Sequence, residues 1–302
     1  MNKKYCYDKQ DPQSKTFDYY CVEIIPIEKL PFVEHSFIHK NNFSGQLFIR
    51  IIAESDLFIG AGEAEVKNNK QVIKFARVGD KIVIPGSSLK GTIRIYSEAL
   101  SPSCLDANCD GDDFCPTCRI FGAKNYQGRI FFNDTISSNA KSKEAVEIFQ
   151  RWGPREWKAC EGRKFYFFDH PNLSQGRKER IETIKKDAQF DSSIEFTNFE
   201  NWELGLFLLS MGCDKNHMFS LKLGGAKNRK HGKVRIELDA RKSLCIKGES
   251  YSKRWLGNKL PQTDFQSFIT EYWNKCGEWN IKTKVEAIIR KFQKGAPDEI
   301  KI

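Results

Sequence analysis

The sequence predicts an α+β fold, and three observations support this prediction. Residues 44–59 alternate and are rich in β-branched and aromatic side chains, which favours a long strand. Residues 88–100 place apolar side chains on one face of a helix, and Pro102 ends it. A strand at 128–136, a helix at 198–212 and a strand–glycine loop–strand unit at 217–240 follow. The order strand, helix, strand, insertion, helix, strand fits a ferredoxin-like core with decorations.

The composition describes a folded, basic protein. The chain has 302 residues, of which 40% are hydrophobic and 13% aromatic, so it can bury a core. Its net charge of +10 favours a polyanionic partner, with nucleic acid before an anionic membrane, although a basic protein without such a partner is the alternative. No apolar run approaches the ~20 residues of a spanning helix, and the polar N-terminus lacks a signal-peptide core. We expect a cytoplasmic protein with no membrane contact.

The first part of the chain leads into the core. Residues 1–42 are expected to form an N-terminal arm with one short apolar segment. Residues 60–70, GAGEAEVKNNK, predict a loop, and the following stretch QVIKFARVGDKIVIPG predicts a hairpin that turns near Gly79 and Asp80.

Two insertions and an extension are expected around the core domain, which spans residues 43–262. The cysteine-rich segment at about 101–122 is one insertion, and the polar, basic segment at about 138–198 is the other. Residues 263–302 repeat apolar side chains at helical spacing, which predicts two amphipathic helices.

The cysteine-rich segment CLDANCDGDDFCPTC predicts a metal site. Its four cysteines, spaced C-x4-C-x5-C-x2-C, are Cys104, Cys109, Cys115 and Cys118. Four thiolates are typical of closed, tetrahedral structural zinc, which can hold a short segment that has no core of its own. Reduced thiols, or a partial site with one spare cysteine, are the alternative. The acids in this segment begin a calcium-loop pattern, but Thr117 stands where the bidentate Glu is required, which disfavours calcium.

The stretch KLGGAKNRKHGKVRI, residues 222–236, is a glycine-rich basic loop between strands. Its six cations, with no acid among them, are Lys222, Lys227, Arg229, Lys230, Lys233 and Arg235. Glycines at 224, 225 and 232 let a backbone approach closely, and free N–H groups beside cations favour phosphate binding. A solvated basic hairpin turn is the alternative. The G-x-G-x-x-G spacing of dinucleotide sites is absent.

The second insertion mixes cations with flat rings. The stretch RWGPREWKACEGRKFYFF places Arg155, Arg163 and Lys164 among two tryptophans and four phenylalanine or tyrosine residues. This combination suits single-stranded RNA, which offers phosphates and unstacked bases. The same aromatic residues could equally belong to a core.

The stretch PGSSLKG begins the first predicted helix. Gly86 and Gly91 have the G-x4-G spacing of a nucleotide phosphate loop, but Thr92 follows where that motif needs Lys, which excludes the motif. A helix N-terminus remains, with Ser87 and Ser88 as capping candidates and Lys90 and Arg94 one turn apart. Such a terminus can bind phosphate. An ordinary capped helix with an exposed lysine is the alternative.

Five motifs taken together are similar to a known family. IPGSSLKGTIR, CPTCRIFG, GRIFFND, ELGLFLLSMG and LGGAKNRKHGKVRI follow one another between about Leu47 and Ile236, some two thirds of the chain. Their combination resembles the RAMP superfamily, the repeat-associated proteins of CRISPR systems. The chain looks most like the backbone subunits of type III effector complexes.

The resemblance implies an RRM-like palm with an inserted thumb, a CRISPR RNA guide bound along the palm, target RNA, and sibling RAMP subunits as neighbours. It implies backbone contacts from the helix start, and phosphate contacts from the glycine-rich loop. The cysteine cluster is similar to zinc knuckles of some type III backbone domains. The candidate RNA-binding residues are Ser87, Ser88, Lys90, Arg94, Arg155, Arg163, Lys164, Gly224, Gly225, Lys227, Asn228, Arg229, Lys230, His231 and Lys233.

The chain departs from the family pattern at the catalytic position. Family members that cut target RNA carry an aspartate in the loop before the PGSSLKG helix, where this chain has Asn69 near the expected place. An amide cannot replace a carboxylate as base or metal ligand. We therefore expect a non-catalytic RNA-binding subunit, with Asp56 and Asp80 as the fallback candidates for catalysis. The alternatives are a target-cleaving endoribonuclease, a stand-alone guide-processing ribonuclease, and a zinc-stabilised protein-interaction module without an RNA role.

Overall fold

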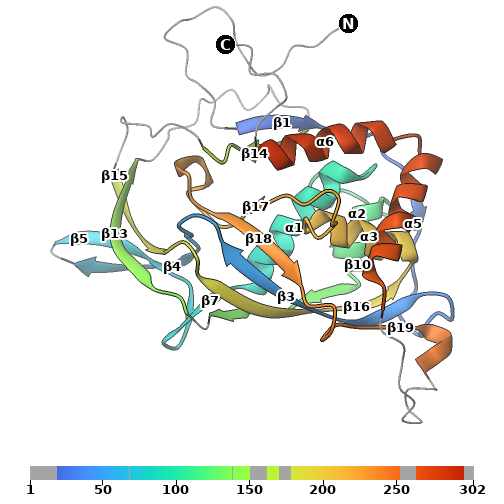
Figure 1. Cartoon of the computed structure of the whole chain (residues 1–302), viewed down its shortest axis with the longest axis horizontal. Helices are drawn as coiled ribbons and strands as arrows, with labels where there is room; N and C mark the ends of the chain where they lie inside the picture. The colour runs from blue at the N-terminus through green and yellow to red at the C-terminus, as the bar shows by residue number, and fades with distance from the viewer. Residues whose placement is uncertain are drawn as a thin grey trace, which may run out of the picture.

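The computed structural model describes residues 19–67, 69–137, 139–149, 162–169, 178–251 and 263–295. Helices and strands are mixed along the chain, and Figure 1 shows the helices gathered on one side of a long, curved sheet. The predicted α+β class is confirmed. Within these residues no helix is both long enough and apolar enough to cross a membrane.

The main sheet is antiparallel and is centred on β3 and β16. Within the described part of the chain it has nine strands in the order β17-β18-β3-β16-β12-β7-β6, with β11 beside β16 and β19 beside β3. Its strands are β3 (Phe43–Ala53), β6 (Arg77–Val78), β7 (Lys81–Ile84), β11 (Ile130–Phe132), β12 (Thr135–Ser137), β16 (Gln189–Phe199), β17 (Leu221–Lys222), β18 (Lys233–Leu238) and β19 (Leu244–Lys247). Every pairing between them is antiparallel.

The core lies between this sheet and four helices: α1 (Gly86–Leu100), α3 (Asn201–Ser210), α5 (Phe265–Glu278) and α6 (Lys282–Lys294). On β3, Leu47, Ile49 and Ile51 point into the core, because successive side chains of a strand face opposite sides. Helix α3 is buried on all sides, since it lies against α1 as well as α5. An apolar helix of this kind is stable only when neighbours cover every face.

Smaller elements surround this core. A second sheet has the order β13-β15-β5-β4 (Figure 1). The short pairs are β1 with β14, β2 with β8, and β9 with β10. Their bounds, with those of the short helices, are β1 (Tyr19–Glu23), β2 (Leu30–Pro31), β4 (Gly60–Lys67), β5 (Lys70–Phe75), β8 (Asp113–Phe114), α2 (Pro116–Phe121), β9 (Gly122–Ala123), β10 (Tyr126–Gln127), β13 (Ser142–Phe149), β14 (Gly162–Tyr166), β15 (Lys178–Ile184), η2 (Lys227–Arg229) and η3 (Gly248–Ser250).

Two segments differ from the sequence-based expectation. Most of the expected loop at 60–70 forms strand β4. Its sequence is polar because it is an exposed edge strand with no face in the core. Residues 189–198, placed in the expected insertion 138–198, instead belong to β16, at the centre of the main sheet. The alternation of Phe190, Ile194 and Phe196, all buried, is the signal for this strand that polar neighbours obscured.

Candidate functional site

The four cysteines of the first insertion meet at one buried point. Their Sγ atoms all lie within 4.8 Å of one another. The Sγ of Cys104 is 3.5 Å from that of Cys118 and 3.6 Å from those of Cys109 and Cys115. A tetrahedral zinc site with Zn–S bonds of about 2.3 Å has sulfurs about 3.8 Å apart. These residues therefore fit a zinc ion.

The backbone around the cysteines favours thiolates. The N–H groups of Cys115 and Cys118 donate to the Sγ atoms of Cys109 and Cys115. Hydrogen bonds from Cys118 lower the pKa of the Cys115 thiol to about 4, whereas burial raises that of Cys104 to about 12. A bound dication would favour the deprotonated form of all four sulfurs.

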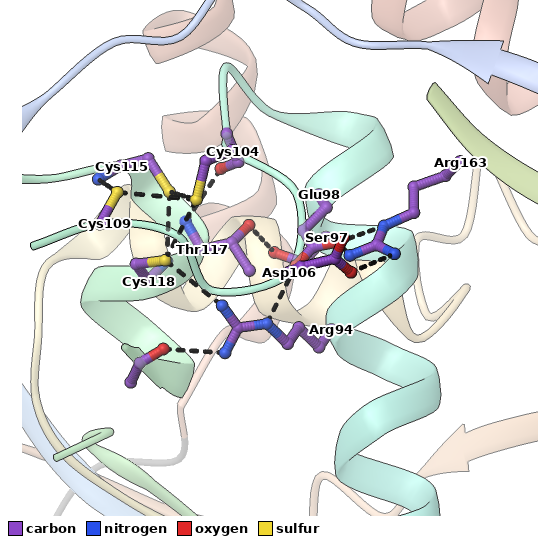
Figure 2. Close-up of polar contacts among 12 residues, drawn as sticks. Arg94, Ser97, Glu98, Cys104, Asp106, Cys109, Cys115, Thr117, Cys118 and Arg163 are labelled. Carbon is purple, nitrogen blue, oxygen red and sulfur yellow. Dashed lines mark hydrogen bonds and ion pairs between the residues drawn. The ribbon is translucent and has the colours of Figure 1, made fainter. Parts of the chain in front are cut away.

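A polar network joins this cysteine cluster to α1 and β14, as Figure 2 shows. Arg94 donates to the Cys118 Sγ at 3.3 Å, to the Gly122 carbonyl at 2.8 Å and to Glu98 at 2.9 Å. Glu98, which is fully buried, also accepts from Arg163 on β14. Two arginines around one buried carboxylate offset part of its desolvation cost.

Arg163 extends the network back to the cysteine segment. Its Nη1 lies 3.0 Å from the Asp106 carboxylate, and Asp106 stands between two of the cysteines (Figure 2). Next to this pair, the Ser97 hydroxyl lies 3.0 Å from that of Thr117, whose N–H donates to Ser103. The cysteine segment, α1 and β14 are thus joined by polar contacts, which are buried at Glu98 and Thr117 and exposed at Asp106. Helix α1 also packs on β14 through the rings of Tyr96 and Phe165.

At the start of α1, fewer backbone N–H groups are available to bind phosphate than the sequence indicated. The Asp134 carboxylate accepts from the Gly86 N–H at 2.8 Å, so an acid already occupies part of this helix N-terminus. Ser87 is exposed and Ser88 half-buried. Lys90 is half-buried, and within the described residues its ammonium pairs with no carboxylate. Burial and the Arg94 charge lower the pKa of Lys90.

The glycine-rich loop packs against the segment that follows β3. The Gly225 and Gly232 N–H groups donate to the carbonyls of Phe58 and Asp56 at 2.8 and 2.9 Å. Gly224 has φ +84°, and a Cβ there would lie 2.1 Å from the Phe58 carbonyl oxygen, so this position requires glycine. These contacts fix the loop at the carboxyl end of β3.

The side chains of this loop differ in exposure. Lys230 is exposed, whereas Lys227, Asn228 and His231 are half-buried and Arg229 is buried. His231 Nδ1 lies 2.6 Å from the Arg229 carbonyl, and burial lowers the pKa of His231. Lys233 lies at the start of β18, 3.4 Å from the Glu54 carboxylate. The loop thus brings cations together beside a fixed backbone.

The family follows from a match over most of the chain. The model of the RAMP superfamily matches residues 50–275. The chain belongs to the RAMP superfamily. Among solved structures, it is similar to a chain in the cryo-EM structure of the type III-B Cmr-beta bound to cognate target RNA, at 18% identity and a TM-score of 0.41. That likeness covers 68% of this chain and 62% of the other. No curated protein matches the sequence.

The matched RAMP region contains all four cysteines, the start of α1 and the glycine-rich loop. Two other candidate RNA contacts have protein partners: Arg163 as described above, and Lys164, whose ammonium lies 4.7 Å from the Tyr19 ring centroid. Arg155 lies outside the described residues. Of the neighbouring aromatics, Phe165 and Phe167 are buried in the core, which favours the packing interpretation for those two residues.

The two candidate catalytic acids of this RAMP chain lie apart in the fold. Asp56 follows β3, where its carboxylate accepts from the Lys186 N–H at 3.1 Å and lies 3.8 Å from the Lys143 ammonium. Asp80 is exposed in the turn between β6 and β7. Within the described residues, the cysteine cluster is the one group of three or more His, Cys, Asp or Glu side chains placed to share a metal.

Two functional candidates were missed from sequence, and a third was predicted only as a charge of the loop. Asp134, in the connection between β11 and β12, accepts from the first N–H of α1, and Glu98 pairs with Arg94 and Arg163, which lie far apart in the chain. Lys222 is only 4% exposed beneath the glycine-rich loop. Its place between two buried leucines predicts an outward side chain, so strand alternation gave no signal of its burial.

Proposed function

We propose that this RAMP-superfamily chain binds the CRISPR RNA guide as a backbone subunit of a type III effector complex. The observation that carries the proposal is the glycine-rich loop, which is fixed at the end of β3 and gathers Lys227, Lys230 and Lys233 beside half-exposed glycine backbone. Clustered cations on a fixed loop are suited to a phosphate backbone, which offers negative charge without sequence information. The net charge of +10 agrees with this partner.

We assign the palm to the central part of the main sheet with α1 and α3. The neighbouring strands β18-β3-β16, with β11 and β12 beside β16, have the spatial order of a ferredoxin-like or RRM-like sheet, and this supports the assignment. In this proposal the thumb is the insertion that contains β13, β14 and β15. We propose that the domain begins at about residue 43 after an arm at 1–42, and that the expected helical extension at 263–302 belongs to the same core, since Tyr272 and Phe292 are buried there.

The contacts to the guide are divided between two places. Ser87, Ser88 and Lys90 form the contact at α1, and the glycine-rich loop forms the other. Arg94 and Arg163 are engaged with Cys118, Glu98 and Asp106, which favours a supporting role for them over direct RNA contact. The cysteine cluster holds one structural zinc, which ties the first insertion to α1.

In our proposal the chain is not the subunit that cuts target RNA. The contacts of the Asp56 carboxylate with the Lys186 N–H and near Lys143 favour a role in fixing the turn before β16. Target RNA and sibling RAMP subunits are the other proposed partners. The chain would then position the guide for its neighbours.

The test is purification of the assembled complex with its RNA, followed by guide binding and target cleavage. We expect guide-length RNA to copurify with the chain and to dissociate steeply as salt rises. Asp56→Ala and Asp80→Ala should leave target cleavage unchanged. Loss of divalent-dependent cleavage in either variant would instead assign catalysis to this chain. Absence of RNA from the purified chain would favour a protein-interaction module.

A further inference from the structure

Three lysines lie close together beneath the glycine-rich loop, and within the described residues only Lys233 has a carboxylate partner, Glu54 at 3.4 Å. The Lys222 side chain is buried, and its Nζ donates to the His231 carbonyl at 3.0 Å. Within the described part of the chain no carboxylate lies within 4.0 Å of the ammonium of Lys222 or of Lys227. An ammonium has three donors, so Lys222 can keep its carbonyl contact and still bind an anion.

A ring from the second insertion covers two of these lysines. The ammonium groups of Lys222 and Lys233 lie 5.8 and 4.8 Å from the Phe168 ring centroid. Directly after α6, Gly295 packs so closely on this ring that an added Cβ would lie 2.1 Å from it. Phe168 is therefore held by the end of α6 and in turn holds both ammonium groups by cation–π contacts.

The surroundings of Lys222 leave it short of negative charge. Burial lowers the pKa of Lys222 to about 8; the neighbouring carboxylate of Asp169 opposes this shift, and the charges of Lys233 and Lys227 add to it. The hydroxyl of Tyr96 accepts from the Lys222 backbone N–H and adds no charge to the group. A buried, incompletely compensated cation is costly, and an anion would relieve that cost.

We propose that Lys222, Lys227 and Lys233 form a subsite for one backbone phosphate of bound RNA, with Phe168 as the residue that positions Lys222 and Lys233. The subsite rests on the proposed RNA-binding function. It adds a buried lysine and an aromatic residue of the insertion to the loop residues predicted from sequence. Since burial lowers the pKa of Lys222 to about 8, RNA affinity should fall as pH rises above neutrality.

The test measures binding of a fluorescently labelled single-stranded RNA to the full chain between pH 7 and pH 9, and across salt at pH 7. We expect wild-type affinity to fall about tenfold between these pH values, because one proton on a group of pKa near 8 is linked to binding. Lys222→Arg keeps its charge and should flatten this profile. Lys222→Met should lower affinity at pH 7 about tenfold and reduce the salt slope by about 0.7.

Phe168 is tested with variants of different aromatic character. Phe168→Leu should reproduce the lower salt slope of Lys222→Met, and Phe168→Tyr should restore it; a purely structural role would not change the slope. Thermal melting identifies variants that fail to fold. If Phe168→Leu or Lys222→Met fails to fold, the pH profile of Lys222→Arg alone decides whether the phosphate subsite exists.

Each outcome separates the subsite from the proposed function. RNA binding with the same pH profile in wild type and Lys222→Arg would overturn the subsite and leave the RNA-binding function standing. Absence of RNA binding by the wild-type chain would overturn both. A mononucleotide that displaces the RNA at micromolar concentration would assign the pocket to a free nucleotide and overturn the backbone-phosphate proposal.

Discussion

At the scale of single residues, side chains that look alike in the sequence have different surroundings in the fold. Lys90 and Arg94 are one turn apart on α1, and the sequence predicts both as candidate phosphate contacts. Lys90 pairs with no carboxylate within the described residues, whereas Arg94 is bound to Glu98, Gly122 and Cys118. The proposed contact at α1 therefore depends on the lysine and the serines before it.

A double substitution at α1 tests this contact. Ser88→Ala with Lys90→Glu should weaken guide binding and reduce its salt slope by about 0.7, because one phosphate contact is lost. Fluorescence anisotropy across salt measures both quantities. Lys282→Glu is the matched control, because it reverses an exposed charge at the first turn of α6, where an acid suits the helix dipole. Equal effects of the two charge reversals would refute a local contact at α1.

At the scale of elements, buried ionic contacts fix segments that have little core of their own. Arg94 and Glu98 bind the cysteine segment to α1, and Arg163 binds β14 to both. In the second sheet, the buried carboxylate of Glu182 on β15 accepts from the Phe75 N–H at 3.1 Å and from Arg77 at 2.7 Å. Removal of one member of such a group leaves a buried charge uncompensated.

Removal of zinc should therefore affect more than the cysteine segment. We expect one zinc per purified chain by elemental analysis, and a lower Tm after chelation, by about 2–4 °C for each kcal/mol lost. Hydrogen exchange should rise in α2 and also in β14, because Arg94, Glu98 and Arg163 link the cysteine cluster to β14 by buried contacts. Cys118→Ser should act in the same way, whereas Cys213→Ser, outside the cluster, should retain the metal. Increased exchange confined to the cysteine segment would contradict coupling to β14.

Glu182 gives the second sheet a dependence on acid. Burial would raise the pKa of Glu182, but hydrogen bonds from Arg77 and the Phe75 N–H lower it to about 2. Its contribution to stability is thus present above about pH 4.5 and is lost as pH falls toward 2. Glu182→Gln should lower the free energy of unfolding at pH 7 by about 2 kcal/mol, less so at pH 3.

Denaturant unfolding at pH 7, 4 and 3 measures this difference. Asp191→Asn removes the exposed pair with Arg50 and serves as the control, with a much smaller effect expected at every pH. A difference between wild type and Glu182→Gln that stays constant from pH 7 to pH 3 would rule out the proposed linkage.

At the scale of the whole molecule, segments distant in sequence share one core. The C-terminal helices, expected as an extension, place Tyr272 and Phe292 in the core with Tyr96 of α1 and Phe165 of β14. At α3, a Cβ on Gly205 would lie 2.0 Å from the Phe268 carbonyl oxygen of α5. The helices α3 and α5 therefore approach at backbone contact.

Removal of the C-terminal helices should destabilise the whole chain. Deletion of residues 263–302 would expose α3 and the aromatic cluster, so we expect an insoluble product or one without a cooperative melting transition. Gly205→Ala should lower the Tm by forcing α3 and α5 apart, whereas Gly91→Ala, at a glycine with open space around it, should raise or maintain it. A truncated chain that melts like wild type would show that the helices are a separate extension.

Local patterns predicted much of this architecture. Leu89, Ile93 and Tyr96 recur at helical spacing and are buried in α1, and the two C-terminal helices lie where their periodicity placed them. The edge strand β4 could not be predicted in this way, because both of its faces are exposed and no alternation is required. Lys222 was predicted only as a charge in the loop, because burial depends on what packs above it.

The sequence by itself determined the elements with a buried face, the clustering of four cysteines within fifteen residues, and the family resemblance, because periodicity and ligand spacing are local properties of the chain. The tertiary structure decided which lysine and arginine side chains keep N–H donors available to a ligand. Glu98, Asp106 and Asp134 engage groups at the start and middle of α1 and on β14, while Lys90 and Lys222 lack a carboxylate partner among the described residues. The sequence shows which residues are charged, but contacts between segments far apart along the chain determine the partner of each charge.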